Sequence, residues 1–148
     1  MFKVNRQQGG FSLLEIMVVV VIIGILVASI APTLFGETEK ARLTRVKVDI
    51  TALEDALERY KMENFNYPTT DQGLEALMTK SFLPPEPKHF KEGGYLRRIQ
   101  KDPWGNDYQY ISPGLERPYD LFTLGADGEE GGEDANTDIG NWNLNELD

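Results

Sequence analysis

Residues 9–35 read GGFSLLEIMVVVVIIGILVASIAPTLF, a glycine pair followed by a long apolar segment. Residues 16–35 contain no charged side chain. Counted from Phe11, the apolar block is about 25 residues long, whereas a helix needs roughly 20 residues to cross a bilayer. The pattern predicts a membrane-spanning helix over residues 11–35, and the length that remains predicts one modest globular domain over residues 36–148.

Two simple interpretations of this segment are a secretory signal peptide and a plain transmembrane anchor. Lys3 and Arg6 ahead of it favour a cytoplasmic N-terminus and an outward C-terminal domain. Neither the signal peptide nor the plain anchor explains Glu15, because a carboxylate in hydrocarbon costs several kcal/mol unless it is paired or neutralised. If a peptidase cuts between Gly10 and Phe11, the new amine lies four residues before Glu15, about one helical turn away. The two groups can then pair within one chain or between neighbouring chains.

Residues 10–15 resemble the type IV prepilin cleavage and methylation motif. The resemblance implies that residues 1–10 are a leader peptide, which a prepilin peptidase removes by cutting after Gly10. It also implies that the same enzyme methylates the new amine of Phe11, and that Glu15 guides the assembly of subunits into a filament.

Three later motifs are similar to those of one branch of this family, the major pseudopilins of type II secretion, or general secretion pathway protein G family. They are YPTT at residues 67–70, GGY at residues 93–95 and DPWG at residues 102–105. The resemblance therefore spans essentially the whole chain. It implies an α+β, type IV pilin-like fold, in which a long N-terminal helix packs on a small antiparallel sheet that carries a calcium-binding C-terminal loop.

The same resemblance implies a function. The chain is expected to be the major structural subunit of a pseudopilus, a helical homopolymer that drives the export of folded proteins across the outer membrane. The implied partners are further copies of the chain, minor pseudopilins, an inner-membrane assembly platform, the prepilin peptidase and, before assembly, membrane lipid. The implied location is the Gram-negative inner membrane, with a single span and a periplasmic domain. Two alternatives stay open: a type IV pilin of an adhesion or motility fibre, and a membrane-anchored calcium-binding domain.

The composition excludes several classes of function. With 24 Asp and Glu against 15 Lys and Arg, the chain is a poor candidate for nucleic-acid binding, because phosphate affinity depends on basic residues. The absence of cysteine removes disulfides and thiolate chemistry. There is no nucleophile elbow, phosphate-binding glycine loop or histidine pair, so we expect no enzymatic activity. Glu54 and Glu58 are spaced as neighbours on an exposed helix face, where we expect them to be solvated.

The residues after the apolar segment predict one long helix that continues to about Asn64. An apolar stripe recurs at alternating steps of three and four, which is typical of a helix with one buried face. Its members are Leu43, Val46, Ile50, Leu53, Leu57 and Tyr60. Gly24 and Pro32 interrupt the apolar half, because proline removes a backbone donor and clashes with the preceding turn. They predict a kink or local opening, and the resemblance implies that this stretch extends during assembly.

The C-terminal half predicts short elements. Thr70 could cap a short helix over residues 71–80, and residues 108–111 and 119–124 are typical of two strands. Trp104 is expected to plug the core where its loop folds over the long helix. A final short strand is expected within residues 139–142.

Residues 125–138 read GADGEEGGEDANTD, an acidic loop rich in glycine. The composition alone favours a flexible acidic tail, but calcium binding is also compatible, because hard cations prefer six to eight oxygen ligands. The loop lacks the EF-hand spacing. The family resemblance implies a Ca²⁺ site here, with Asp134 and Asn136 as competing candidates. The full candidate set is Leu124, Asp127, Glu129, Asp134, Asn136 and Asp138, with Leu124 and Glu129 acting through their carbonyls.

Overall fold

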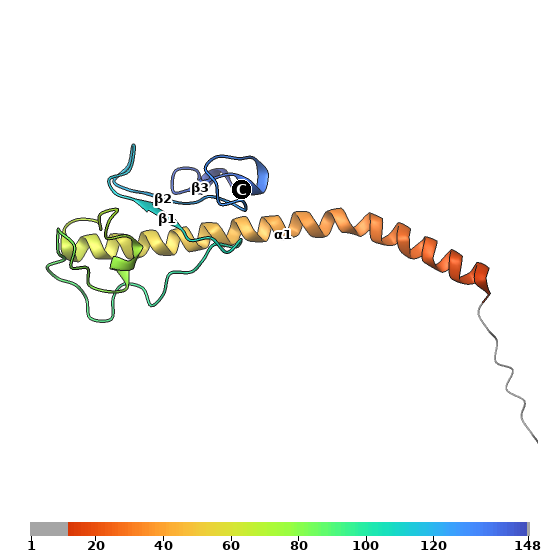
Figure 1. Ribbon diagram of the computed structural model, residues 1–148, viewed down its shortest axis with the longest axis horizontal. Coiled ribbons are helices and arrows are strands. Elements are labelled where there is room, and N and C mark those ends of the chain that lie inside the picture. The colour runs from red at the N-terminus through yellow and green to blue at the C-terminus, as the bar shows by residue number, and fades with distance from the viewer. Residues whose placement is uncertain (1–11, 148) are drawn as a thin grey trace, which may run out of the picture. The chain divides into compact units, whose positions relative to one another are not determined.

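The computed structural model describes the backbone of residues 12–147 and the side chains of residues 12–27 and 38–147. The chain divides into two compact units, Met1–Thr38 and Glu39–Asp148. One helix, α1 (Leu13–Asn64), runs without interruption from the first unit into the second (Figure 1). The predicted long helix and its end at Asn64 are therefore confirmed.

The first part of α1 is apolar around its whole circumference. Every described side chain from residue 12 to residue 27 is exposed, including Leu13, Val20 and Leu26. Such a surface has no counterpart on a typical soluble monomer, where large apolar patches mark contact sites. Among the described residues, none of the helices combines the length and the hydrophobicity needed to cross a bilayer. Part of the predicted span lies outside the described residues, as do the side chains of residues 28–37.

The second part of α1 buries one face in the core of the globular unit. Val46, Ile50 and Leu57 are fully buried, which confirms the predicted stripe; Leu43, its first member, is partly buried. Apolar side chains from the rest of the chain cover this face. The buried partners are Leu74, Ala76, Leu77, Tyr95, Tyr108, Tyr110, Tyr119, Leu121 and Ile139.

The end of α1 is set by its last residue and by the residue that follows. Phe65 has a φ of 70°, a left-handed conformation typical of the position after a helix, and its N–H donates to the Lys61 carbonyl at 2.7 Å. The Asn64 amide donates to the Tyr60 carbonyl at 3.0 Å, and its oxygen accepts from the His89 N–H at 3.0 Å. Asn64 thereby ties the helix end to a distant loop.

Three short antiparallel strands form a sheet in the order β1-β2-β3. They are β1 (Gln109–Ile111), β2 (Asp120–Thr123) and β3 (Ile139–Gly140), close to the predicted positions. Tyr110 pairs with Leu121, and both side chains are buried. In Figure 1 the sheet lies on one side of the second half of α1, whereas η1 (Leu74–Leu77) and the segment after it lie on the other side.

The predicted helix over residues 71–80 is wrong in extent and in type. Only η1 forms, as one short 3₁₀ turn, and its Leu74 and Leu77 are buried in the core. Thr70 does not cap it. Its hydroxyl donates to the Ser112 carbonyl at 3.1 Å and accepts from the Ser112 N–H at 2.8 Å, which joins this turn to the end of β1. Two further 3₁₀ turns, η2 (Asp134–Asn136) and η3 (Leu144–Glu146), follow β2 and β3.

Candidate assembly site and metal-binding loop

Glu15 lies in the first turn of α1, and its side chain is exposed among exposed apolar neighbours. A carboxylate at this end of a helix is favoured by the helix dipole. The predicted leader, the cleavage position Gly10 and the predicted partner Phe11 lie outside the described residues. The pairing of the Phe11 amine with Glu15 therefore stays a prediction.

Gly24 lies inside the unbroken helix. A Cβ placed there would meet no heavy atom within 4 Å, so the chain's own packing does not require glycine at this position. The side chain of Pro32 lies outside the described residues. The expected extension between Gly24 and Pro32 refers to assembled subunits, and it stays a prediction.

The acidic loop is folded back on itself between β2 and β3. The Ala126 N–H donates to the Ala135 carbonyl at 2.9 Å, and the Asn106 amide donates to the Gly125 carbonyl at 2.8 Å. Two glycines make this closure possible. Gly125 and Gly132 have φ values of 69° and 95°, and a Cβ on either would come within 2.7 Å of the Asn136 backbone.

The predicted ligands lie around this closed loop. Asp127 accepts a hydrogen bond from the Glu129 N–H at 3.2 Å, and one oxygen of Asp138 accepts from the Gly131 N–H at 2.9 Å. The other oxygen of Asp138, Oδ1, is buried and has no hydrogen-bond partner among the described residues. Asp134 begins η2 with a φ of 54°.

The predicted ligand set is only partly gathered. Within the described part of the chain, no group of three or more His, Cys, Asp or Glu side chains is close enough to hold a metal ion. The donor chemistry nevertheless fits a hard cation, because the loop offers carboxylate, amide and carbonyl oxygens and no sulfur or imidazole. Within the loop, the buried Asp138 Oδ1 is a described carboxylate oxygen without a hydrogen-bond partner, which is compatible with a bound cation.

Sequence reasoning missed Asp102, whose hydrogen bonds support the acidic loop. Its side chain is buried, and it accepts hydrogen bonds from the Trp104 N–H at 3.0 Å, the Asn106 N–H at 2.7 Å and the Thr123 hydroxyl. Since Asn106 also holds Gly125, this carboxylate connects the DPWG turn to β2 and to the loop. The sequence signal that could have identified this residue is the aspartate at the start of the DPWG motif, residues 102–105. Trp104 packs against the core, as predicted.

Glu58 is exposed, as predicted, whereas Glu54 is half-buried, contrary to prediction. Glu58 accepts a hydrogen bond from the Tyr67 hydroxyl, and Lys61 Nζ lies 4.5 Å from the centre of the Tyr67 ring. Burial raises the pKa of Glu54, while hydrogen bonds from Asn141 and Tyr119 oppose that rise. The periodicity placed both residues correctly on the helix but gave no indication that tyrosines cover this side.

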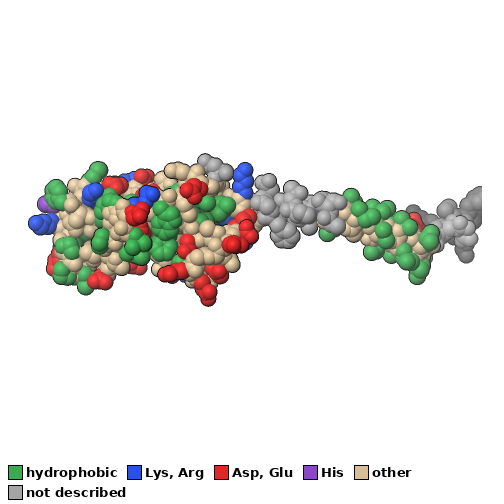
Figure 2. All heavy atoms as spheres, turned by 90° about the horizontal axis from the view of Figure 1, so that it is seen from above, with side chains coloured by type: hydrophobic (Ala, Val, Ile, Leu, Met, Phe, Trp, Pro, Cys, Tyr) green, Lys and Arg blue, Asp and Glu red, His purple; other side chains and the backbone are tan. Residues whose placement is uncertain are grey.

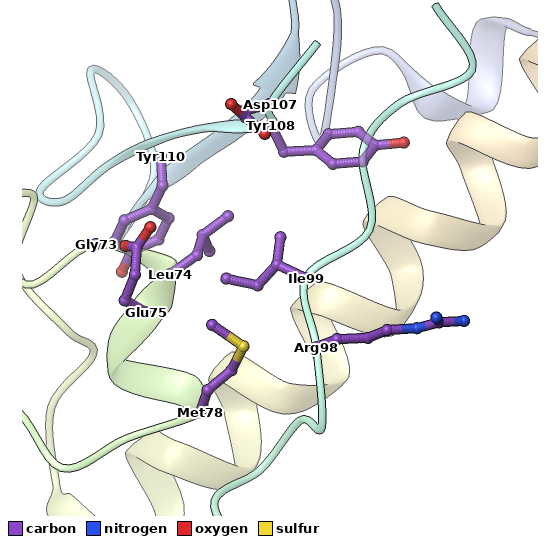
Figure 3. Close-up of a pocket in the computed structure, with 9 residues that line it drawn as sticks. All are labelled: Gly73, Leu74, Glu75, Met78, Arg98, Ile99, Asp107, Tyr108 and Tyr110. Atoms are coloured by element: carbon purple, nitrogen blue, oxygen red, sulfur yellow. The ribbon is translucent and has the colours of Figure 1, made fainter. Parts of the chain in front are cut away.

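A cleft of about 470 Å³ lies between η1, β1 and the segment around Ile99. Figure 3 shows Leu74, Ile99 and Met78 turned towards one another in it, whereas the Arg98 guanidinium points away. These described side chains bring together no nucleophile and base.

The exposed apolar helix, the glycine–phenylalanine motif ahead of it and the small sheet packed on its second half together define a pilin-like subunit. Residues 5–31 match the family described as the prokaryotic N-terminal methylation motif. Residues 33–142 match the family described as type II secretion system (T2SS), protein G. The chain belongs to this type II secretion system protein G family.

Individual relatives agree with this assignment. The type II secretion system core protein G of Vibrio cholerae is 59% identical over 98% of this chain and 99% of its own length. The protein of the same name from Pseudomonas aeruginosa is 54% identical over 93% of this chain and 97% of its own. The crystal structure of the major pseudopilin from the type 2 secretion system of enterohaemorrhagic Escherichia coli superposes with a TM-score of 0.67 at 46% identity, covering 75% of this chain and 95% of that one.

Proposed function

We propose that this chain is the major structural subunit of a type II secretion pseudopilus. In this proposal it assembles into a helical filament that drives the export of folded proteins across the outer membrane. One observation carries the proposal beyond family membership: in the same helix that enters the compact globular unit, the described residues 12–27 are largely apolar and exposed on all sides. Such a helix requires other apolar surfaces around it, which lipid supplies before assembly and neighbouring subunits supply afterwards.

The mechanism divides the work between the two units. The apolar half of α1 anchors the mature subunit in the inner membrane and then packs in the filament core, while the globular unit stays in the periplasm. Glu15 pairs with the methylated amine of Phe11, which sets how far one subunit is shifted relative to the next. The sequence contains no phosphate-binding glycine loop, so in this proposal a cytoplasmic ATPase supplies the energy through the assembly platform. Minor pseudopilins complete the filament.

The replacement Glu15→Ala tests this mechanism. We expect unchanged membrane insertion and a loss of filaments and of protein export, because the charge that selects the neighbouring amine is gone. Filament yield and secreted protein are measured in cells that contain the other components. Ser12→Ala, in the same exposed segment, is the matched control and should assemble normally. Mass spectrometry of the mature N-terminus should find methylated Phe11. Normal filaments from Glu15→Ala would contradict the assigned role.

We also propose that residues 125–138 bind Ca²⁺. The buried, unpartnered Oδ1 of Asp138 and the all-oxygen donor set support this. The residues that would hold the ion are Asp127, Asp134 and Asp138, with the carbonyls of Leu124 and Glu129 and, as a weaker candidate, Asn136. When bound, Ca²⁺ supplies the positive charge that offsets the carboxylates of the loop, and it cross-links a small domain that has no disulfide.

A melting experiment tests the calcium proposal. For a chain beginning at residue 35, a chelator should lower the Tm by roughly 10 °C or more, since saturation a hundredfold above Kd contributes about 2.7 kcal/mol. Asp138→Ala should melt at the lower temperature with or without Ca²⁺. Glu146→Ala, an acidic residue outside the loop, should keep the full calcium response. The same melting curve with Ca²⁺ and with chelator would remove the proposal.

A further inference from the structure

The sheet has an apolar groove on the face turned away from α1. Ile111 and Trp142 keep 43% and 41% of their surface exposed, and Leu115, in the loop after β1, keeps 95%. Phe122 forms the floor, with its ring 5.4 Å from that of Trp142. The groove has a volume of about 520 Å³, within the roughly 300–1,000 Å³ of ligand pockets. We call it the outer groove.

Local contacts build the outer groove. The Asp120 carboxylate accepts from the Leu115 N–H at 2.9 Å, which holds the loop after β1 against the end of β2. Trp142 lies flat over Gly140, where a Cβ would come 2.5 Å from the indole. An exposed tryptophan beside an exposed aliphatic residue is typical of the centre of a protein interface.

The rim of the outer groove is acidic. Its charged residues are Glu116, Glu130 and Arg117, together with Asp120, which is buried and bound to the Leu115 N–H, and Asp138, which belongs to the proposed calcium loop. Figure 2, seen from above Figure 1, looks onto this side of the molecule and shows apolar side chains gathered next to acidic ones. An occupant should therefore present apolar side chains together with positive charge.

The chain carries such a segment itself, at residues 80–83, with the sequence Lys-Ser-Phe-Leu. Phe82 is 80% exposed and Leu83 is 49% exposed. Residues 80–91 contain three lysines and one glutamate. We call residues 80–83 the apolar knob.

The knob is held in place before it meets a partner. The buried Gln72 side chain donates to the Leu83 carbonyl at 2.7 Å and to the Pro85 carbonyl at 2.9 Å. The Leu83 N–H donates to the Ser81 hydroxyl at 3.1 Å. A backbone fixed in this way loses little conformational entropy on binding, so the exposed side chains can contribute most of their burial free energy.

We propose that the outer groove binds the apolar knob of a second copy of this chain. In the single chain Phe82 keeps 80% and Leu115 keeps 95% of its surface exposed, so one copy does not bury its knob in its own groove. Two different surfaces in contact make a heterologous interface, which repeats from copy to copy and yields an open helical assembly when the rotation between copies does not close a ring. The inference rests on the proposed function and adds to it a contact between globular units.

Cysteine cross-linking tests the contact directly, because the chain has no cysteine of its own. The full chain carrying both Leu115→Cys and Phe82→Cys, assembled with the other secretion components and oxidised, should give a ladder of dimers, trimers and longer oligomers. Each single replacement should give none. A ladder supports the contact. Dimers from Leu115→Cys alone would indicate two grooves facing each other and would overturn it.

A charge exchange tests the rim. Lys80→Glu and Glu116→Lys should each lower the filament yield several-fold, and the two together should restore it, because the opposite charges meet again in the reverse order. Two additive losses without recovery would contradict the pairing of these residues.

The apolar part is tested by Phe82→Ser, which should lower the filament yield at least tenfold. The control is Phe65→Ser, since Phe65 is 78% exposed but lies outside the knob, and it should assemble like the unaltered chain. If the unaltered chain forms filaments while Phe82→Ser assembles equally well and the cysteine pair gives no ladder, this contact is wrong and the proposed function stands. If the unaltered chain forms no filaments, both are wrong.

Discussion

Asp102 shows how one buried carboxylate can organise a loop region. A buried charge is expensive unless hydrogen bonds compensate it, and here two backbone N–H groups and the Thr123 hydroxyl do so. Those donors come from the turn after Pro103 and from β2, so the carboxylate fixes their relative positions. The acidic loop depends on this arrangement, because Asn106 holds the Gly125 carbonyl.

Asp102→Ala should lower the free energy of unfolding by about 3 kcal/mol, because it leaves buried donors without an acceptor. Asp102→Asn should cost only about 1 kcal/mol. Its amide oxygen can still accept from the backbone, and its nitrogen can donate to the Thr123 hydroxyl. Urea denaturation of the chain beginning at residue 35 measures both values. Equal losses for the two variants would mean that the hydrogen bonds are not the cause.

At the scale of elements, α1 has two halves that differ in what surrounds them. The described side chains of the first half, residues 12–27, are all exposed, whereas the second half buries a stripe under the sheet and under η1. The second half is therefore stabilised by its own domain. The described part of the first half, residues 12–27, buries no such stripe.

Leu57→Ala should cost about 3 kcal/mol of stability, since Leu57 is fully buried and the replacement leaves a cavity. Val48→Ala is the matched control on the opposite face of the same helix. Val48 is 61% exposed, and its replacement should change stability by less than about 0.5 kcal/mol. Denaturation of the chain beginning at residue 35 distinguishes the two. Similar values at both positions would contradict the assignment of the buried face.

At the scale of the whole molecule, tyrosines supply much of the globular core. All six have a raised pKa, and burial is the first cause in every case. Burial raises the pKa of Tyr95 and of Tyr110 to about 12. Neighbouring carboxylates add to the effect, with Glu63 beside Tyr95 and Asp49 beside Tyr108.

These shifts predict a loss of stability in alkali. Below the ordinary tyrosine pKa of about 10, the phenols are neutral in both folded and unfolded chains, and their contribution is fully present. Above pH 10 the unfolded chain ionises first, so stability should fall as the pH rises towards 12. Phenolate absorbance followed during a pH titration should remain low in the folded chain and rise together with unfolding. Ionisation of all the tyrosines near pH 10 with the fold intact would contradict this.

Much of the fold follows from local pattern. The apolar stripe of α1, its end at Asn64 and the positions of the three strands were predicted, because side-chain periodicity and turn residues act over a few neighbouring positions. The short helix after Thr70 was predicted incorrectly. Its capping signal was local, but the Thr70 hydroxyl pairs instead with Ser112, more than forty residues away.

The N-terminal motif and the three later motifs, at residues 67–70, 93–95 and 102–105, were visible as short runs of residues, and the family they indicated is the one to which the chain belongs. Only the tertiary structure revealed the buried acceptor role of Asp102, the tyrosines covering Glu54, and the groove between Leu115 and Trp142. Each of these depends on residues that are distant along the chain and become neighbours only when the sheet closes over α1. Periodicity records which face of an element is buried, but it does not record which distant side chain will cover it.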